Sequence, residues 1–176
     1  CQANYSILFT DGFGSASEDV TTAVGNADAD GDSPDPKGNT VFDGASFADL
    51  FSGTTADVAM YYLERDIAPS LAVEAKIRDN RRGVGDVINH QHMTTYTIGF
   101  GVNGTLSDDP TDVDTAFPWT ANSIDDMRHA AWNGRGQFLG SSNPVKLISS
   151  IKDIFDDIDT RNTQTTAASS VSSGFI

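Results

Sequence analysis

The chain has 176 residues, 38% of them hydrophobic, which is enough for one domain of ordinary size with a packed core. Its 25 acidic and 11 basic side chains give a formal net charge of -14, so nucleic acid and anionic membrane surfaces are poor partners and cations are better ones. No stretch approaches the roughly 20 apolar residues of a membrane-spanning helix. No signal peptide is recognisable, so we expect any export signal to lie upstream of Cys1.

The first predicted element is a buried strand, Tyr5 to Phe9, which runs directly into Thr10-Asp11-Gly12. In open α/β sheets, ligands bind just beyond the carboxyl ends of the strands, so Asp11 is the first candidate functional residue. Residues 14–53 follow as a long irregular segment rich in Gly, Asp, Ser, Asn and Pro. Segments of this length and composition are usually functional or disordered loops.

A helix and a strand are predicted next. Thr54-Thr-Ala-Asp57 has the spacing of a capping box and predicts a helix that continues to about Ile67, before Pro69. From Thr94 to Val102, large apolar residues alternate with small ones, which is the pattern of a strand.

The last third of the chain predicts two helices around a short strand. Ser123 to Asp126 repeats the capping-box spacing and begins a helix over 124–132, which Asn133-Gly134 ends. A strand is predicted over Gln137 to Leu139. Asn143-Pro144 then begins a helix whose apolar face comprises Leu147, Ile151, Ile154, Phe155 and Ile158.

The alternation of strands and helices predicts an α/β fold with parallel strands, right-handed crossovers and covering helices. Three strands make a thin sheet, so we expect further cover from a segment that precedes residue 1. The Thr/Ala/Ser-rich residues 161–176 are predicted to be a linker or the start of a following domain. Cys1 is the only cysteine and is free, artificially terminal or paired outside this sequence.

One acidic segment has the pattern of a calcium loop. Asn26 to Asp32 places oxygen-bearing side chains at alternate positions with a glycine sixth, as in the first half of an EF-hand. Position twelve is Lys37, where a bidentate Glu is required, so a true EF-hand is not expected. We expect a Ca²⁺-stapled loop with ligands from Asn26, Asp28, Asp30, Asp32 and either Asp35 or Asp43. The alternative is a solvated acidic loop that binds no ion tightly.

Two other patterns receive ordinary structural interpretations. Gly99 to Gly104 matches the glycine string of dinucleotide sites, but an acidic turn follows it in place of a helix, so a tight turn is expected. His90 and His92 are spaced to supply two zinc ligands, but no further ligand pattern lies nearby. These two histidines and His129 are predicted to pack and hydrogen-bond, and no catalytic nucleophile, base and acid set is recognisable.

Four blocks resemble, in order, segments of the PilY family of type IV pilus tip adhesins and assembly factors. They are Cys1 to Gly12, Ala56 to Tyr62, His92 to Gly101 and Ile124 to Gly136. The resemblance implies that residues 1–160 form the later half of a von Willebrand factor A-like (Rossmann-like) domain, with 14–53 as a loop insertion. The run from His129 to Gly136 is the most specific part, because a generic A domain does not need it.

The resemblance also implies a metal role for Asp11. The adhesion site of A domains combines an Asp-x-Ser-x-Ser loop, a distant Thr and the Asp of the Thr-Asp-Gly turn, and Asp11 matches the last of these. Ser15-Ala-Ser17 has the wrong spacing for the first motif and is not assigned to it. A carboxylate with hydroxyls suits Mg²⁺. The alternative is that Asp11 only caps its turn.

The implied function is non-enzymatic: pilus assembly and metal-dependent adhesion by an exported protein at the cell surface or pilus tip, with the periplasm or outer membrane as other locations. The implied partners are minor pilins and a host or abiotic surface, and a β-propeller-like domain usually follows. Two alternatives stay open. One is a secreted metal-dependent hydrolase that uses Asp11, the Asp28 to Asp35 cluster and His90 with His92. The other is a calcium-stabilised structural subunit of an extracellular assembly.

Overall fold

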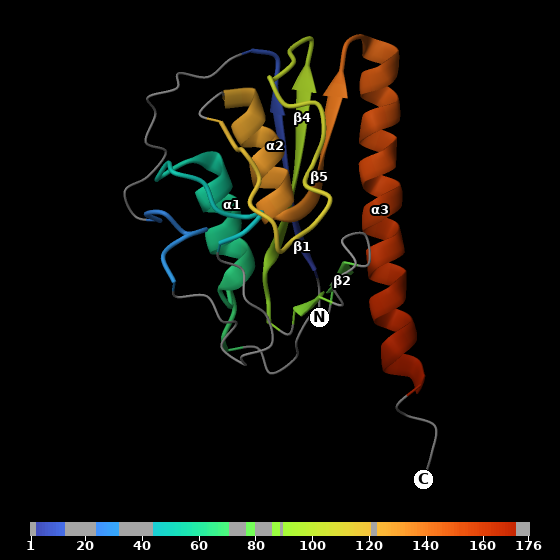
Figure 1. The fold of residues 1–176 in the computed structure, drawn as a ribbon. Coiled ribbons are helices and arrows are strands. Elements are labelled where there is room, and N and C mark those ends of the chain that lie inside the picture. Colours follow the sequence, from blue (N-terminus) through green and yellow to red (C-terminus); the bar gives the residue numbers. More distant parts are fainter. Residues whose placement is uncertain are drawn as a thin grey trace.

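A computed structural model describes residues 3–12, 24–31, 44–70, 77–79, 86–88, 90–120 and 123–171 (Figure 1). Asp32, Asp35 and Asp43 of the predicted calcium loop, and Ser15 and Ser17, lie outside these residues. The elements are, in order, β1 (Asn4–Thr10), α1 (Thr55–Glu64), β2 (Ile77–Asp79), β3 (Asp86–Ile88), β4 (Met93–Phe100), α2 (Ser123–Asn133), β5 (Arg135–Ser141) and α3 (Pro144–Val171).

The centre of the fold is a three-stranded parallel sheet in the order β1-β4-β5. Helices α1 and α2 lie on one side of this sheet and α3 lies on the other (Figure 1). The predicted α/β class, the parallel strands and the three helices are therefore confirmed. The arrangement is consistent with part of a Rossmann-like domain. None of the described helices is long and apolar enough to cross a membrane.

The middle strand β4 is covered on both faces, as expected for a parallel sheet. On one face Tyr96 and Ile98 pack against Ile154 of α3, and the Tyr96 hydroxyl donates to Asp157 of α3 at 2.5 Å. On the other face the Thr97 hydroxyl donates to Met127 O of α2 at 2.8 Å. The edge strand β1 leaves Ile7, Leu8 and Phe9 exposed by 37–53%. The further cover expected for this strand stays a prediction.

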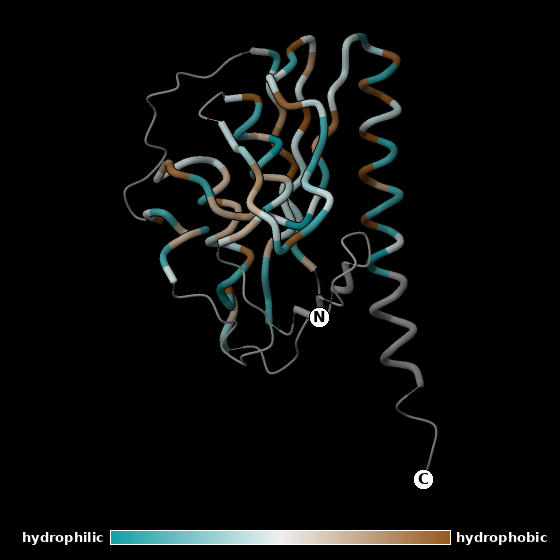
Figure 2. The backbone as a smooth tube through the Cα atoms, viewed as in Figure 1, coloured by the Kyte–Doolittle hydropathy of each residue, from teal (hydrophilic) through white to brown (hydrophobic). Residues whose placement is uncertain are grey.

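Several elements differ from those predicted. Hydrophobic and hydrophilic residues alternate along the coloured part of α3 (Figure 2), and the helix continues past Arg161 to Val171, where the sequence has no such apolar pattern. Strand β5 begins at Arg135, two residues earlier than predicted. A short antiparallel pair, β2 with β3, lies in the polar segment before β4, where strands of three residues are too short to show periodicity.

The described parts of the loop insertion are built into the core. Ala27 and Phe47 pack with Met60, Leu63, Trp119 and Trp132 in one buried cluster. Backbone bonds hold the two parts of the loop together, from Gly53 N to Gly25 O at 2.8 Å and from Gly44 N to Asp28 O at 3.0 Å. These described parts of the insertion therefore pack against α1 and α2.

The turn between α2 and β5 requires glycine on both sides of Arg135. A Cβ atom at Gly134 would lie 2.6 Å from the Thr95 Cβ, and one at Gly136 would lie 1.9 Å from the Thr95 carbonyl oxygen. Arg135 has φ 57°, in the left-handed region. The run Gly134-Arg135-Gly136 therefore forms the tight turn that lets β5 pair with β4 immediately after α2.

We expect Gly136→Ala to destabilise the protein by about 1–3 kcal/mol or more, because its Cβ would collide with backbone that has no room to move. The measurement is the urea unfolding midpoint. Gly12→Ala is the matched control, since a Cβ there meets nothing within 4 Å. Equal midpoints for the two variants would contradict this account of the turn.

Candidate functional site

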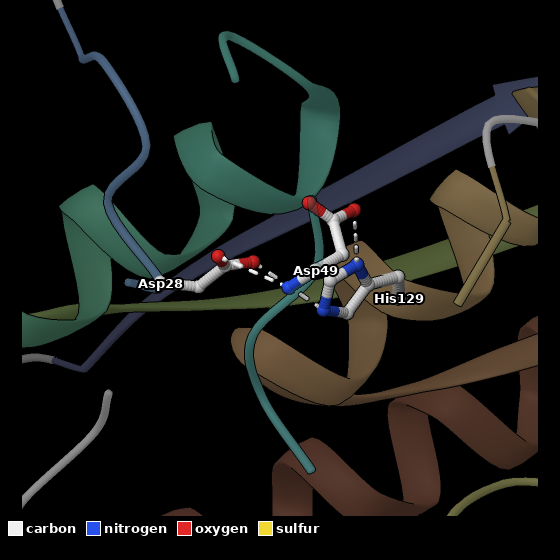
Figure 3. Close-up of side chains that lie close together, drawn as sticks. All are labelled: Asp28, Asp49 and His129. Carbon is white, nitrogen blue, oxygen red and sulfur yellow. Dashed lines mark hydrogen bonds and ion pairs between the residues drawn. The ribbon is translucent and has the colours of Figure 1, made fainter. Parts of the chain in front are cut away.

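Three segments that are distant in sequence meet at a buried cluster of titratable side chains. Asp28 comes from residues 24–31, Asp49 from the segment before α1, and His129 from the middle of α2 (Figure 3). The exposed fractions of their side chains are 0%, 4% and 1%. One ligand atom from each residue lies within 4.8 Å of the others.

The imidazole of His129 has a carboxylate near each ring nitrogen and a tryptophan against one face. Its Nε2 donates to Phe47 O at 2.5 Å and lies 3.5 Å from Asp28 Oδ2, while its Nδ1 lies 3.4 Å from Asp49 Oδ2. The ring stacks on Trp119 with centroids 4.1 Å apart and an interplanar angle of 13°. Because a carbonyl accepts at Nε2, that nitrogen carries a proton.

Asp28 is the most strongly perturbed carboxylate of the cluster. It accepts from Asn133 Nδ2 at 3.1 Å and from Asp49 N at 3.4 Å. Burial raises the pKa of Asp28 to about 7; His129 opposes this rise, and the carboxylates of Asp57 and Asp49 add to it. The site is therefore a buried, predominantly acidic environment with one imidazole.

The other acidic residues of α2 have structural roles. Asp126 accepts from Thr55 N at 3.0 Å and Ala56 N at 3.1 Å, and so places a carboxylate at the positive end of α1. The Thr54–Asp57 capping box predicted for α1 is also present. The sequence predicted that Asp126 would close a capping box within α2. Both of its carboxylate oxygens instead accept hydrogen bonds from the backbone of α1.

Asp125 organises the turn that follows β4. It accepts from Thr105 N at 2.8 Å, Leu106 N at 3.1 Å and the Thr120 hydroxyl at 2.7 Å. A Cβ at Gly104 would collide with its carboxylate, and Gly101 has φ 72°. The tight-turn interpretation of the Gly99 to Gly104 string is confirmed.

The structure separates most of the predicted metal ligands. Asp28 alone of those described belongs to the cluster with Asp49 and His129. Asp30 is exposed, and Asp11 is exposed beyond the end of β1. Asn26, with its amide nitrogen turned inward, donates to Asp28 Oδ1 at 3.2 Å and to Phe51 O at 2.8 Å.

The two histidines before β4 lie elsewhere and form no group of three ligands among the described residues. His90 Nε2 donates to Leu63 O at 2.7 Å, and His92 Nδ1 donates to His90 O at 2.8 Å. Burial lowers the pKa of His92 to about 4. Both histidines are buried and each uses one ring nitrogen in a hydrogen bond, as predicted, while His90 Nδ1 and His92 Nε2 have no hydrogen-bond partner.

Sequence reasoning missed Asp49, and for His129 it predicted packing and a hydrogen bond, both of which the structure shows, but no place in a cluster. Asp49 lies in a short apolar stretch of the acidic loop, between Phe47 and Phe51. That apolar stretch is the sequence feature that could have indicated a buried turn there. His129 stands in the run that ends at Gly136. The cluster offers two carboxylates and an imidazole, which suit either a buried ion-pair network or a cation.

Comparisons with known proteins relate the chain to pilus proteins. It is similar to the type IV pilus biogenesis factor PilY1 of Pseudomonas aeruginosa strains PAK, PAO1 and UCBPP-PA14, with 27%, 26% and 28% identity over 90%, 90% and 93% of the chain. The chain spans 16% of the length of each of these relatives. No protein-family model and no solved structure matches it. The similarities support a relationship to the PilY family.

We expect the unfolding free energy of the metal-free protein to depend on pH through the protonation of Asp28. Because its folded pKa is raised to about 7, the folded chain keeps a proton that the unfolded chain releases above pH of about 4. This contribution is fully present below pH of about 4 and is lost as the pH rises to about 7. Relative to Asp28→Asn, the wild type therefore loses roughly a few kcal/mol of unfolding free energy across that range.

The measurement is urea unfolding at several pH values between 4 and 7 with a chelator present. Asp114→Asn, which changes an exposed acidic residue of another loop, serves as the control and should follow the wild type. Wild-type and Asp28→Asn curves that run parallel would contradict the role of Asp28.

Proposed function

We propose that this chain, which is related to the PilY family, is a non-enzymatic part of an exported protein that acts in type IV pilus assembly and surface attachment. The supporting observation is the similarity to three proteins named type IV pilus biogenesis factors, which extends over at least 90% of the chain. Its most distinctive block, Ile124 to Gly136, is also the segment that orders the loops of this fold.

A binding role is favoured over catalysis by the burial of the titratable groups. The side chains of Asp28, Asp49 and His129 are at most 4% exposed, so a macromolecular substrate does not reach them. Exposed acidic side chains include Asp11, Asp30 and Asp114, in agreement with the net charge of -14. Such a surface suits partners that are basic or that bind through a shared cation.

The proposed partners are minor pilins at the pilus tip and a host or abiotic surface, and the proposed location is the pilus tip or cell surface. We also propose that attachment uses a divalent cation. Asp11 is the proposed Mg²⁺ ligand, since it is exposed at the carboxyl end of β1, where a partner can share an ion. The acidic loop from Asn26 to Asp35 is the proposed Ca²⁺ segment.

The test uses the full-length protein in its own bacterium. Deletion of residues 1–171 is expected to reduce the number of surface pili, counted by electron microscopy. Asp11→Ala is expected to leave piliation intact but to lower Mg²⁺-dependent attachment several-fold, because the adhesion role needs its carboxylate. The readouts separate assembly from adhesion.

Asp153→Ala is the matched control, because it removes one exposed carboxylate from α3, away from the end of β1. Normal piliation and attachment after the deletion would refute the proposed function. An Asp11→Ala protein that supports attachment as well as Asp153→Ala would refute only the role of Asp11.

A further inference from the structure

We propose that Asp28, Asp49 and His129 form a buried site for zinc or a similar divalent transition-metal ion. This ligand set differs from the predicted calcium loop, because it adds Asp49 and His129 and excludes Asp30. The proposal rests on side-chain geometry and is independent of the proposed pilus function.

The imidazole of His129 is oriented as a metal ligand. Histidines that bind metal characteristically donate their other ring N–H to a carbonyl or carboxylate, and Nε2 of His129 donates to Phe47 O. This bond leaves Nδ1 free to coordinate. Nδ1 has no hydrogen-bond partner although the side chain is only 1% exposed.

The spacing fits a tetrahedral ion. His129 Nδ1 lies 3.4 Å from Asp49 Oδ2. Two neighbouring ligands of zinc, each bonded at roughly 2.0–2.1 Å, lie about 3.3 Å apart. Asp28, whose Oδ2 lies 3.5 Å from Nε2 of the same ring, is the third member of the group, in which one ligand atom from each residue lies within 4.8 Å of the others (Figure 3). Three protein ligands leave one position for water.

The buried negative charge of the cluster also favours a bound cation. A lone pair on Nδ1 facing a carboxylate is repulsive unless a proton or a metal ion lies between them. Asp57 is fully buried nearby and adds its charge to those of Asp49 and Asp28. Asn133 donates to Asp28 through Nδ2, while its buried Oδ1 has no hydrogen-bond partner. A divalent ion would compensate buried negative charge that is otherwise costly.

The donor set distinguishes the class of ion. Imidazole nitrogen suits zinc and other first-row divalent metals, whereas Ca²⁺ and Mg²⁺ prefer oxygen alone. Leu50, next to Asp49 in the chain, is 96% exposed, so the segment that supplies Asp49 lies at the protein surface. The ring of Trp119, stacked on His129, gives the site an internal fluorescent reporter.

The experiment titrates the purified, chelator-treated chain with Zn²⁺ alone at pH 7.5, followed by calorimetry and tryptophan fluorescence. We expect one Zn²⁺ per chain and a change in tryptophan emission at the same stoichiometry. Asp49→Asn is expected to weaken binding at least about tenfold. This variant keeps an Oδ1 acceptor for Phe51 N, which Asp49 binds at 2.7 Å, so the loop retains its local bond.

Asp30→Asn is the matched control, because it removes an exposed acid of the same loop and should bind Zn²⁺ like the wild type. His129→Gln is the second variant, checked by circular dichroism, and should also lose binding. The proposal is overturned if the wild type takes up no stoichiometric Zn²⁺, which would identify the cluster as an imidazolium held between carboxylates. Equal weakening by Asp30→Asn and Asp49→Asn would overturn it as well.

Discussion

Helix α2 is the constraint on which the rest of this structure depends, because its side chains satisfy the backbone of three other segments. Asp126 caps α1, Asp125 holds the turn after β4, and His129 binds the carbonyl of Phe47. These bonds are short, buried or partly buried, and directed at groups that would otherwise lack partners. The described parts of the loop insertion are therefore held in place by α2 and by the tryptophans beside it.

This organisation links the most distinctive block of the sequence to the fold. The block Ile124 to Gly136, which indicates the PilY family, contains the cap of α1, the imidazole of the buried cluster and the glycines that let β5 join β4. Each role depends on residue type and position together. A helix that only had to cover a sheet would need an apolar face and nothing more.

Local patterns predicted the regular elements well. These patterns are the alternation in β4, the Thr54–Asp57 capping box and the apolar face of α3. Each extends over about a dozen residues or fewer, so it can be recognised in the sequence. The cluster of Asp28, Asp49 and His129 cannot be recognised in this way, because its members come from three segments distant in the sequence and only tertiary packing brings them together. The loop insertion was predicted to be an irregular loop, yet its residues Ala27 and Phe47 belong to the hydrophobic core. They are too far apart in the sequence to form a periodic apolar pattern.

The most direct test of this account is hydrogen exchange in His129→Ala. If α2 orders the insertion, amides in residues 44–53 lose protection when the bond to Phe47 O and the stack on Trp119 are removed, while those of β4 stay protected. Unchanged protection of residues 44–53 in the folded variant would contradict the central role of α2.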